Sequence, residues 1–199
     1  MSALGNTMKF CSDCAEPVSK KIPSGDTVAR YVCASCDTIH YQNPRMVVGV
    51  VVAQEDTVLL CRRAIEPRKG FWTLPAGFME NGETSLSGAL RETWEEARAE
   101  VDTPQLYRMF ELPYINQVYI LYRGLLRAGN YAAGPESLEV ELFKEADIPW
   151  QELAFPIVTD TLKEYFEDRK TGVFPVRISE VEPHWQRHKA ALSTEAKPA

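Results

Sequence analysis

The sequence has 199 residues, 45% of them hydrophobic, which is enough for one substantial core and a small additional module. Its 22 basic and 28 acidic residues give a net charge of −6, which argues against nucleic acid as a partner. An anionic substrate would therefore need cations supplied locally. No apolar run approaches the roughly 20 residues of a membrane span or forms a signal peptide, so we expect a cytoplasmic protein with no membrane partner.

The first 40 residues predict a module without a conventional core. Residues 1–8 are expected to be flexible, and residues 9–40 show no sustained helical or strand period. Two Cys-x2-Cys pairs stand 18 residues apart, a spacing typical of a structural zinc site with no open coordination position. The four expected zinc ligands are Cys11, Cys14, Cys33 and Cys36. We therefore interpret residues 9–40 as a zinc ribbon.

The alternative for these cysteines is two disulfides or free thiols. A total of five cysteines, four of them in tight pairs, fits poorly with a secreted disulfide framework and favours a reducing compartment. His40 is interpreted as a linker residue, because four thiolates suffice for zinc. Cys61 stands in an apolar segment and is interpreted as an ordinary buried cysteine.

The main domain is expected over residues 41–180, followed by a loosely ordered tail at 181–199. β-Branched runs predict two strands joined as a hairpin, and a loop is expected at 76–82. The expected strands are 45–53, 57–63, 71–75, 106–112, 118–126 and 138–143. One helix should start at Thr84 or Ser85, with an inward stripe of Leu86, Ala89, Leu90 and Ala97, and a second should cover 157–169. This order predicts an α+β domain with a mixed sheet and covering helices.

The chemistry is expected between Gly77 and Ala99. Six residues there follow the pattern G-x5-E-x7-R-E-x-x-E-E, and they are Gly77, Glu83, Arg91, Glu92, Glu95 and Glu96. On a helix the last three glutamates share one face, and carboxylates held so close repel unless cations neutralise them. Oxygen ligands favour hard ions, so we expect Mg²⁺ or Mn²⁺.

The other residues of the pattern have expected roles of their own. Arg91 can pair with Glu83 and tie the loop to the helix without using a metal ligand, and the Gly77 carbonyl can complete the coordination. The alternative is a solvated helix face of charged pairs. That alternative does not account for a glycine, a distant glutamate and an arginine in one register.

This pattern resembles the box that defines the Nudix family. The chain departs from it twice, with Thr93 in place of an aliphatic residue and Arg98 in place of a glycine near the helix end. A left-handed backbone at that end costs a residue with a side chain roughly 1 kcal/mol, so we expect helix termination to differ locally.

The resemblance extends over residues 9–170. The ribbon, YQNPRMVVG, FWTLPAGFMENGE, RETWEEA and GPESLEVELF together resemble Nudix enzymes of bacteria and plant chloroplasts that hydrolyse FAD and ADP-ribose. The resemblance implies an α/β/α Nudix fold, two or three Mg²⁺ or Mn²⁺ ions, and a homodimer. NADH pyrophosphatase is the second relative, but its Ser-Gln-Pro-Trp-Pro-Phe-Pro signature is absent, and the stretch here reads MFELPYINQ.

The second relative also implies roles for residues outside the box. By this resemblance Tyr41 and Phe78 flank the nucleotide rings, and Glu136 joins the metal ligands. The alternatives are ordinary packing for the two aromatic residues and a solvated loop for Glu136 and Glu139. The possible general bases are Glu92, Glu96, Glu136 and Glu139, which the sequence does not rank.

A different class of function is a non-enzymatic module that senses a nucleotide and binds nucleic acid through the ribbon. Four basic residues make this conceivable: Lys9, Lys20, Lys21 and Arg30. Four acidic residues of the same segment offset them: Asp13, Glu16, Asp26 and Asp37. Because a sensor has little use for a full set of metal carboxylates, the enzyme is the favoured interpretation.

Overall fold

The computed structural model describes residues 8–182. The expectations of a flexible N-terminus and a loosely ordered tail fall almost entirely on residues 1–7 and 183–199, outside the described part. Backbone contacts divide the chain into two compact units, Met1–Pro44 and Arg45–Ala199. Neither helix in the described residues is long and apolar enough to cross a membrane.

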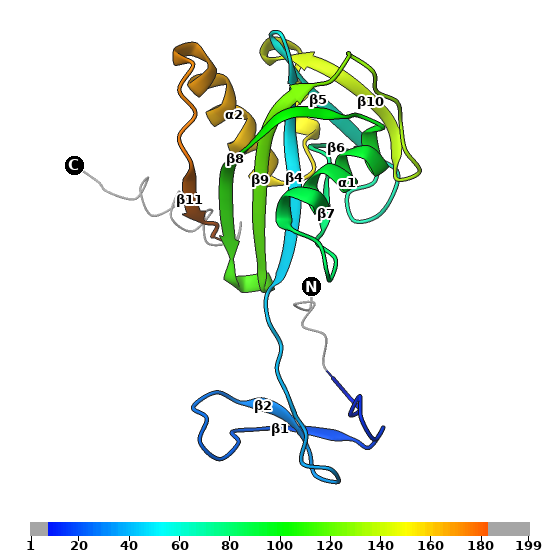
Figure 1. Cartoon of the computed structure of the whole chain (residues 1–199), viewed down its shortest axis with the longest axis vertical. Helices are drawn as coiled ribbons and strands as arrows, with labels where there is room; N and C mark the ends of the chain where they lie inside the picture. The colour runs from blue at the N-terminus through cyan, green and yellow to red at the C-terminus, as the bar shows by residue number, and fades with distance from the viewer. Residues whose placement is uncertain (1–7, 183–199) are drawn as a thin grey trace, which may run out of the picture. The chain divides into compact units, whose positions relative to one another are not determined.

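The first unit is a small antiparallel sheet in the order β1-β2-β3 (Figure 1). Its strands are β1 (Val18–Lys21), β2 (Arg30–Cys33) and β3 (Ile39–His40). Few of its side chains are buried, and two of those are Cys11 and Cys33. A unit with so little apolar burial needs another source of stability.

The second unit is built on a mixed sheet of eight strands, whose main path runs β10-β5-β4-β9-β8-β11. β4 pairs in parallel with β9, β8 pairs in parallel with β11, and the other pairs are antiparallel. The strands are β4 (Arg45–Gln54), β5 (Thr57–Arg63), β6 (Trp72–Thr73), β7 (Ala76–Phe78), β8 (Val101–Leu112), β9 (Gln117–Leu126), β10 (Ser137–Lys144) and β11 (Arg177–Glu180). Three short 3-10 turns are present in the described residues. One follows β8 (Pro113–Ile115), one follows β10 (Glu145–Asp147), and one lies in the link to the second helix (Trp150–Glu152).

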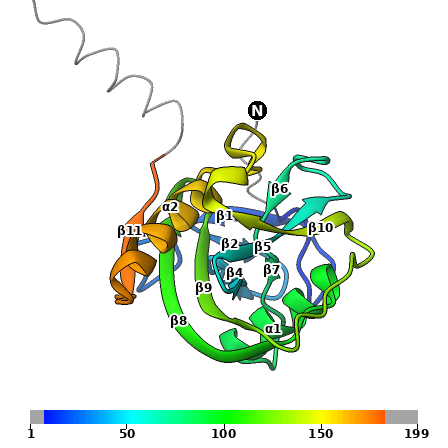
Figure 2. The same ribbon diagram turned by 90° about the horizontal axis from the view of Figure 1, so that it is seen from above.

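Two helices cover opposite faces of this sheet, as Figures 1 and 2 show. Helix α1 (Ser85–Ala97) packs on one face, where Ala89 and Ala97 join a core with the valines of β4. Helix α2 (Pro156–Thr171) packs on the other face and contributes Leu162 and Phe166 to a second core. The α+β prediction, with a mixed sheet between covering helices, is confirmed.

The two central strands separate soon after their turn. β4 and β5 pair only through Ala53 with Val58 and Gln54 with Thr57. Beyond that point β6 pairs with β5 and β7 pairs with β4, so the short strands fill the gap. A side chain at Gly49 would overlap Ala76, which explains why β7 lies so close to β4. This opening in the sheet is where α1 approaches.

Several expected elements differ in detail. The predicted loop 76–82 begins with strand β7, because residues 76–78 bond to β4. The inward face of α1 is rotated: its buried residues are Gly88, Ala89, Thr93, Glu96 and Ala97, whereas Leu86 and Leu90 are only half-buried. β8 starts five residues earlier than expected, with a bulge near Thr103, whose φ is 51°. Strand β11 was not predicted, because its four residues are too few to show a clear alternation of apolar and polar side chains.

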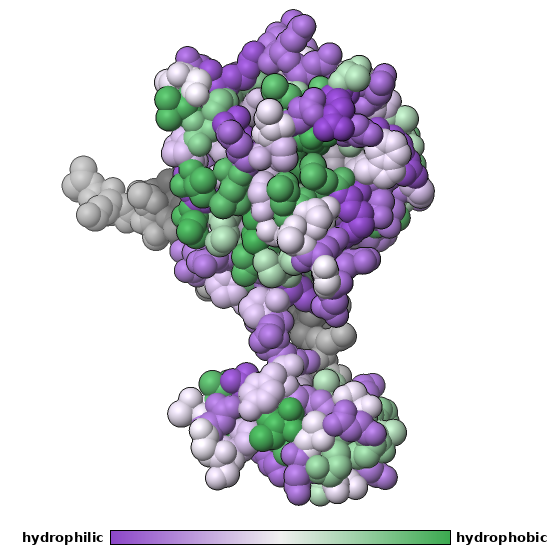
Figure 3. Space-filling model, in the orientation of Figure 1, coloured by the Kyte–Doolittle hydropathy of each residue, from purple (hydrophilic) through white to green (hydrophobic). Residues whose placement is uncertain are grey.

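Helix α1 covers only part of its face of the sheet. Large apolar side chains remain exposed on the strands of this face, among them Leu106 of β8 and Ile178 of β11. Figure 3 shows hydrophobic residues gathered on this side of the second unit. Such exposure exceeds the scattered single residues that are usual on a protein surface.

A buried charged network fastens α2 to the sheet. Both terminal nitrogens of Arg177 donate to Asp168, and the hydroxyl of the buried Tyr107 donates to the same carboxylate at 2.8 Å. The Arg177 guanidinium holds the pKa of Asp168 below its ordinary value of 3.8. The ion pair therefore links the end of α2 with β8 and β11.

We expect Asp168→Asn to lower the free energy of unfolding by about 2 kcal/mol at pH 7, because charged hydrogen bonds are lost. Since the folded-state pKa of Asp168 is depressed, its stabilisation is complete above pH 3.8 and is lost as the pH falls through the folded value. Urea denaturation at pH 7 and pH 3 measures this. Glu167→Gln, at an exposed pair with Lys170, is the control. An equal effect of both substitutions would contradict the assignment.

Candidate active site

Helix α1 begins where the sequence predicts. The hydroxyl of Thr84 accepts from the backbone N–H of Ser87 at 3.1 Å, and the Ser87 hydroxyl accepts from the backbone N–H of Thr84 at 2.8 Å. This reciprocal capping box satisfies amide groups that a helix start leaves unpaired. The cap also fixes the residue at which the helix starts, and every later glutamate of the motif lies on this helix.

Two glycines make room for two glutamates. A side chain at Gly77 would overlap the carboxylate of Glu92, and a side chain at Gly88 would overlap that of Glu83. The motif predicts a close approach to the backbone at Gly77. The group that approaches its Cα atom is the Glu92 carboxylate. Gly88 was missed. Its signal was a glycine inside a helix, where it costs roughly 1 kcal/mol relative to alanine.

Arg91 holds the acidic residues of the motif together. Its Nε and Nη2 donate to Glu83 at 3.1 and 2.8 Å, which is the expected pair. Its Nη1 donates to Glu92 at 2.8 Å and to Glu95 at 3.0 Å. Arg91 therefore forms the expected pair with Glu83 and, in addition, contacts two of the expected metal ligands. Carboxylates that repel one another attract the nearest cation, and Arg91 is one residue from Glu92 and one helical turn from Glu95.

Glu96 is the most buried carboxylate of the cluster, with 6% of its surface exposed. Its Oε2 accepts from the backbone N–H of Ala76 at 3.0 Å, so it spans from α1 to β7. Burial raises the pKa of Glu96 to about 8, and the charges of Glu92 and Glu136 add to the increase. Burial also raises the pKa of Glu92. Both shifts arise first from burial, which disfavours the charged form of a carboxyl group.

The segment between β9 and β10 reaches the end of α1. The backbone N–H of Ala132 donates to the Ala97 carbonyl and that of Gly134 to the Glu96 carbonyl, both at 2.9 Å. A side chain at Gly134 would overlap the backbone of Glu95. This close approach brings Glu136 near enough to act on Glu92 and Glu96. Sequence reasoning missed Gly134, because the contact joins segments almost forty residues apart.

The two departures from the family pattern are accommodated. Thr93 is fully buried, and its hydroxyl donates to the Ala89 carbonyl at 2.7 Å. Arg98 adopts the left-handed backbone with φ of 49°, and its N–H donates to the Trp94 carbonyl. The expected local change in helix termination is wrong. The helix still ends at Ala97, and the Arg98 guanidinium lies 5.6 Å from the centre of the Trp94 ring.

The remaining candidates differ in their surroundings. Phe78, next to Gly77, is half-exposed, and the Arg45 guanidinium lies 5.3 Å from its ring centre. Glu139 is exposed and forms a 3.3 Å ion pair with Arg62. Tyr41 belongs to the first unit, where it is exposed beneath the Arg30 guanidinium. A role of these three in substrate binding or catalysis stays a prediction.

The donor set at α1 fits hard divalent cations. Glu92, Glu95, Glu96 and Glu136 offer only carboxylate oxygen atoms, which are the ligands that hard divalent cations prefer. The structure is compatible with either Mg²⁺ or Mn²⁺.

The four cysteines of the ribbon already form a site. Their sulfur atoms all lie within 4.8 Å of one another, and three sulfur–sulfur distances are 3.4, 3.4 and 3.6 Å. A tetrahedron with zinc–sulfur bonds of about 2.3 Å has edges of about 3.8 Å, so the cluster fits Zn²⁺ closely. His40 is outside this cluster. All five cysteines are free thiols, which is against the disulfide alternative.

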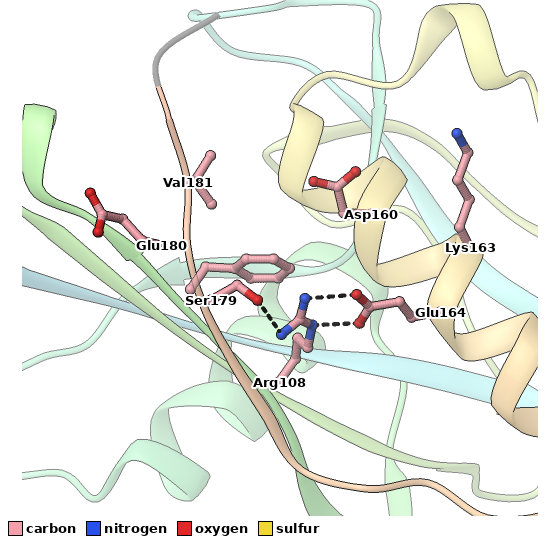
Figure 4. A pocket seen from close by; sticks show the side chains of 8 residues that line it. Arg108, Asp160, Lys163, Glu164, Ser179, Glu180 and Val181 are labelled. Carbon is pink, nitrogen blue, oxygen red and sulfur yellow. Dashed lines mark hydrogen bonds and ion pairs between the residues drawn. The ribbon is translucent and has the colours of Figure 1, made fainter. Parts of the chain in front are cut away.

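A separate pocket of about 300 Å³ lies between α2 and β11 (Figure 4). The buried Arg108 crosses it, with Nε and Nη2 facing the Glu164 carboxylate and Nη1 donating to the Ser179 hydroxyl. None of the glutamates of the motif lines this pocket. Arg108 of β8 thus bonds to both α2 and β11 and fastens these elements together.

Two family models match the chain. A model of the N-terminal zinc ribbon of Nudix proteins matches residues 9–42, and a model of the Nudix domain matches residues 43–167. Together they cover the ribbon and all of the glutamates discussed above.

Curated relatives include NAD-capped RNA hydrolases of Edwardsiella ictaluri and Salmonella heidelberg. The first is 28% identical over 131 residues, which are 66% of this chain and 49% of the relative. The second is 28% identical over 142 residues, 71% of this chain and 53% of the relative. The chain thus spans about half the length of the curated relatives it matches.

Solved structures show the same fold. A Nudix hydrolase from Nitrosomonas europaea is 50% identical with a TM-score of 0.85, and the match covers 88% of this chain and all of that one. An ADP-ribose pyrophosphatase from Streptococcus suis is 22% identical with a TM-score of 0.55, covering 68% and 99% of the two chains. The second likeness concerns the fold alone.

We expect Gly134→Ala to lower turnover roughly tenfold or more, because displacing the loop by about 1 Å moves Glu136 away from the other glutamates. The Mg²⁺ concentration for half-maximal activity should rise as well. Steady-state kinetics over a Mg²⁺ titration measure both. Ala133→Ser, in the same exposed loop, is the control. Unchanged Mg²⁺ dependence in Gly134→Ala would contradict this role for the loop.

The purified chain should hold one Zn²⁺ ion, measured by atomic absorption. Cys36→Ser should abolish zinc binding, because a thiolate ligand is lost from a site with no spare position. Cys61→Ser, which alters the buried cysteine of β5, should leave the zinc content unchanged. A zinc-free protein without titratable thiols would instead favour the disulfides.

Proposed function

The chain belongs to the Nudix hydrolase family, and on this basis we propose that it is a metal-dependent pyrophosphohydrolase acting on a nucleoside diphosphate linked to a second group. FAD, giving FMN and AMP, and ADP-ribose, giving AMP and ribose 5-phosphate, are the proposed substrates. The observation that carries the proposal is that Glu92 lies against Gly77 and Glu96 accepts from the Ala76 N–H, while the charge of Glu136 acts on both.

In the proposed reaction, water attacks one phosphorus of the diphosphate and the bridging P–O bond breaks. Mg²⁺ or Mn²⁺, when bound, would orient the diphosphate and activate the water. Glu92, Glu95, Glu96 and Glu136, with the Gly77 carbonyl, would hold these ions. Arg91 and Glu83 would fix the loop before α1 and keep the helix in position.

A carboxylate must accept the proton of the attacking water. Glu96 is buried, Glu92 is half-buried and bonded to Arg91, and Glu139 is paired with Arg62. Glu136 is exposed and forms no ion pair within residues 8–182. We propose Glu136 as the first candidate for the base, because an exposed carboxylate with a free lone pair can meet a bound water directly.

The remaining expectations from the sequence and from the resemblance stay part of the proposal. They are a homodimer, stacking of substrate rings on Tyr41 and Phe78, structural Zn²⁺ in the ribbon, and a cytoplasmic location. The exposure of both aromatic rings supports stacking, since a ring in a packed core would have no free face.

A second candidate substrate class is NADH or an NAD-like cap. It is favoured by the curated relatives named NAD-capped RNA hydrolases. The stretch MFELPYINQ after the box stands where NADH pyrophosphatases carry a different signature, which places this class second. Hydrolysis of FAD, ADP-ribose, NADH, NAD⁺, CoA and diadenosine compounds, with chromatography of the products, separates the classes. Activity confined to nucleoside triphosphates would refute both.

We expect Glu96→Gln to lower turnover by roughly 10²-fold or more, because a metal carboxylate is lost. The variant should fold at least as stably, since the amide is uncharged at every pH and its oxygen can still accept from the Ala76 N–H. Product chromatography and thermal unfolding measure the two effects. Glu100→Gln, just beyond α1 in an exposed pair with Arg127, is the matched control. Near-normal turnover of Glu96→Gln would overturn the metal assignment.

A further inference from the structure

Arg63 lies beside the carboxylate cluster at the end of β5. It pairs with Ser137 of β10, and its N–H donates to the Phe71 carbonyl at 2.9 Å. The next residue, Ala64, donates its N–H to the carbonyl of Glu136 at 2.8 Å. The backbone of Arg63 is therefore bonded on both sides and is adjacent to the loop that carries Glu136.

The Arg63 side chain faces groups from two other elements of the opened sheet. Its charge acts on the Glu96 carboxyl of α1, where it opposes part of the pKa increase that burial causes. It also acts on the hydroxyl of Tyr119 in β9, whose pKa burial raises. Its guanidinium carbon lies 5.3 Å from the centre of the Phe155 ring, just before α2. Arg63 thus lies in the segment bonded to the backbone of Glu136, with its guanidinium over an aromatic ring.

The donors of Arg63 are oriented but largely unused. Its Nε donates to the Pro67 carbonyl at 2.8 Å, which sets the plane of the guanidinium. Within residues 8–182 its Nη1 and Nη2 form no hydrogen bond or ion pair. By contrast, Arg91 is bonded to three glutamates and the Phe78 carbonyl, and Arg62 is bonded to Gly70 and Glu139.

A guanidinium with two free donors, fixed beside metal carboxylates and an aromatic group, fits a phosphate. We propose that Arg63 is a substrate-binding residue whose Nη1 and Nη2 bond to phosphate oxygens of the substrate diphosphate. The inference rests on the proposed function, because it needs a diphosphate at the carboxylate cluster. It adds a cation from the protein to a site that otherwise offers mainly negative charge.

The competing interpretation is structural: Arg63 would merely tie the 64–70 loop to Phe155. The two interpretations differ in what substitution changes. Loss of a phosphate contact weakens substrate binding in the ground state and in the transition state alike, so KM rises while kcat changes little. Loss of a structural contact to the loop would instead lower the melting temperature. It would not raise KM selectively over kcat.

The experiment compares Arg63→Gln and Arg63→Lys with the wild-type chain on FAD and ADP-ribose. We expect Arg63→Gln to raise KM about tenfold or more with kcat within about threefold, as for a lost charged hydrogen bond. Arg63→Lys keeps the charge but lacks the planar pair of donors, so its KM should lie between those of the wild-type chain and Arg63→Gln. Arg68→Gln removes a positive charge from the adjoining loop and is the matched control.

Binding of inorganic pyrophosphate with Mg²⁺, measured by calorimetry, separates this inference from the proposed function. Weaker pyrophosphate binding by Arg63→Gln, but not by Arg68→Gln, supports the contact even if neither dinucleotide is hydrolysed. Hydrolysis by the wild-type chain with an unchanged KM in Arg63→Gln overturns the inference and leaves the proposed function intact. A loss of melting temperature with unchanged pyrophosphate affinity also overturns it.

Discussion

Carboxylates held close together in a partly buried place are the constraint on which the second unit depends. Glu92 lies against the Cα atom of Gly77, and Glu96 is bonded to the backbone of β7. Each contact requires α1 to approach the sheet more closely than ordinary side chains would allow. The separation of β4 from β5, the short strand β7 and the glycines at 77 and 88 all serve this approach.

Arg91 offsets part of the repulsion between these glutamates. One guanidinium bonds to three glutamates and a carbonyl, so that a single side chain links the loop, the helix and the metal ligands. Of these contacts, the pair with Glu83 is the one that involves no expected metal ligand. The Glu83 contact is supported by the space at Gly88.

The sequence predicted what depends on local pattern. The start of α1 at Thr84 follows from capping chemistry, and the sharing of one face by Glu92, Glu95 and Glu96 follows from helical period. It did not predict the strand at β7, which exists only because β4 offers a bonding edge. Nor did it predict Gly134 or Arg63, because their importance comes from contacts between segments distant in the chain. The expectation for Arg98 was wrong because the 132–134 loop and Trp94 stabilise the helix end in place of a glycine.

The loop from Ala132 to Ser137 leads directly into β10, which is the edge strand of the sheet. Edge strands open more readily than central ones, since they are bonded on one side only. The acidic site is therefore completed by one of the least protected parts of the second unit. Assembly of the site should come late in folding, after α1 and the central strands are in place. On warming, catalytic competence should vanish before the core melts.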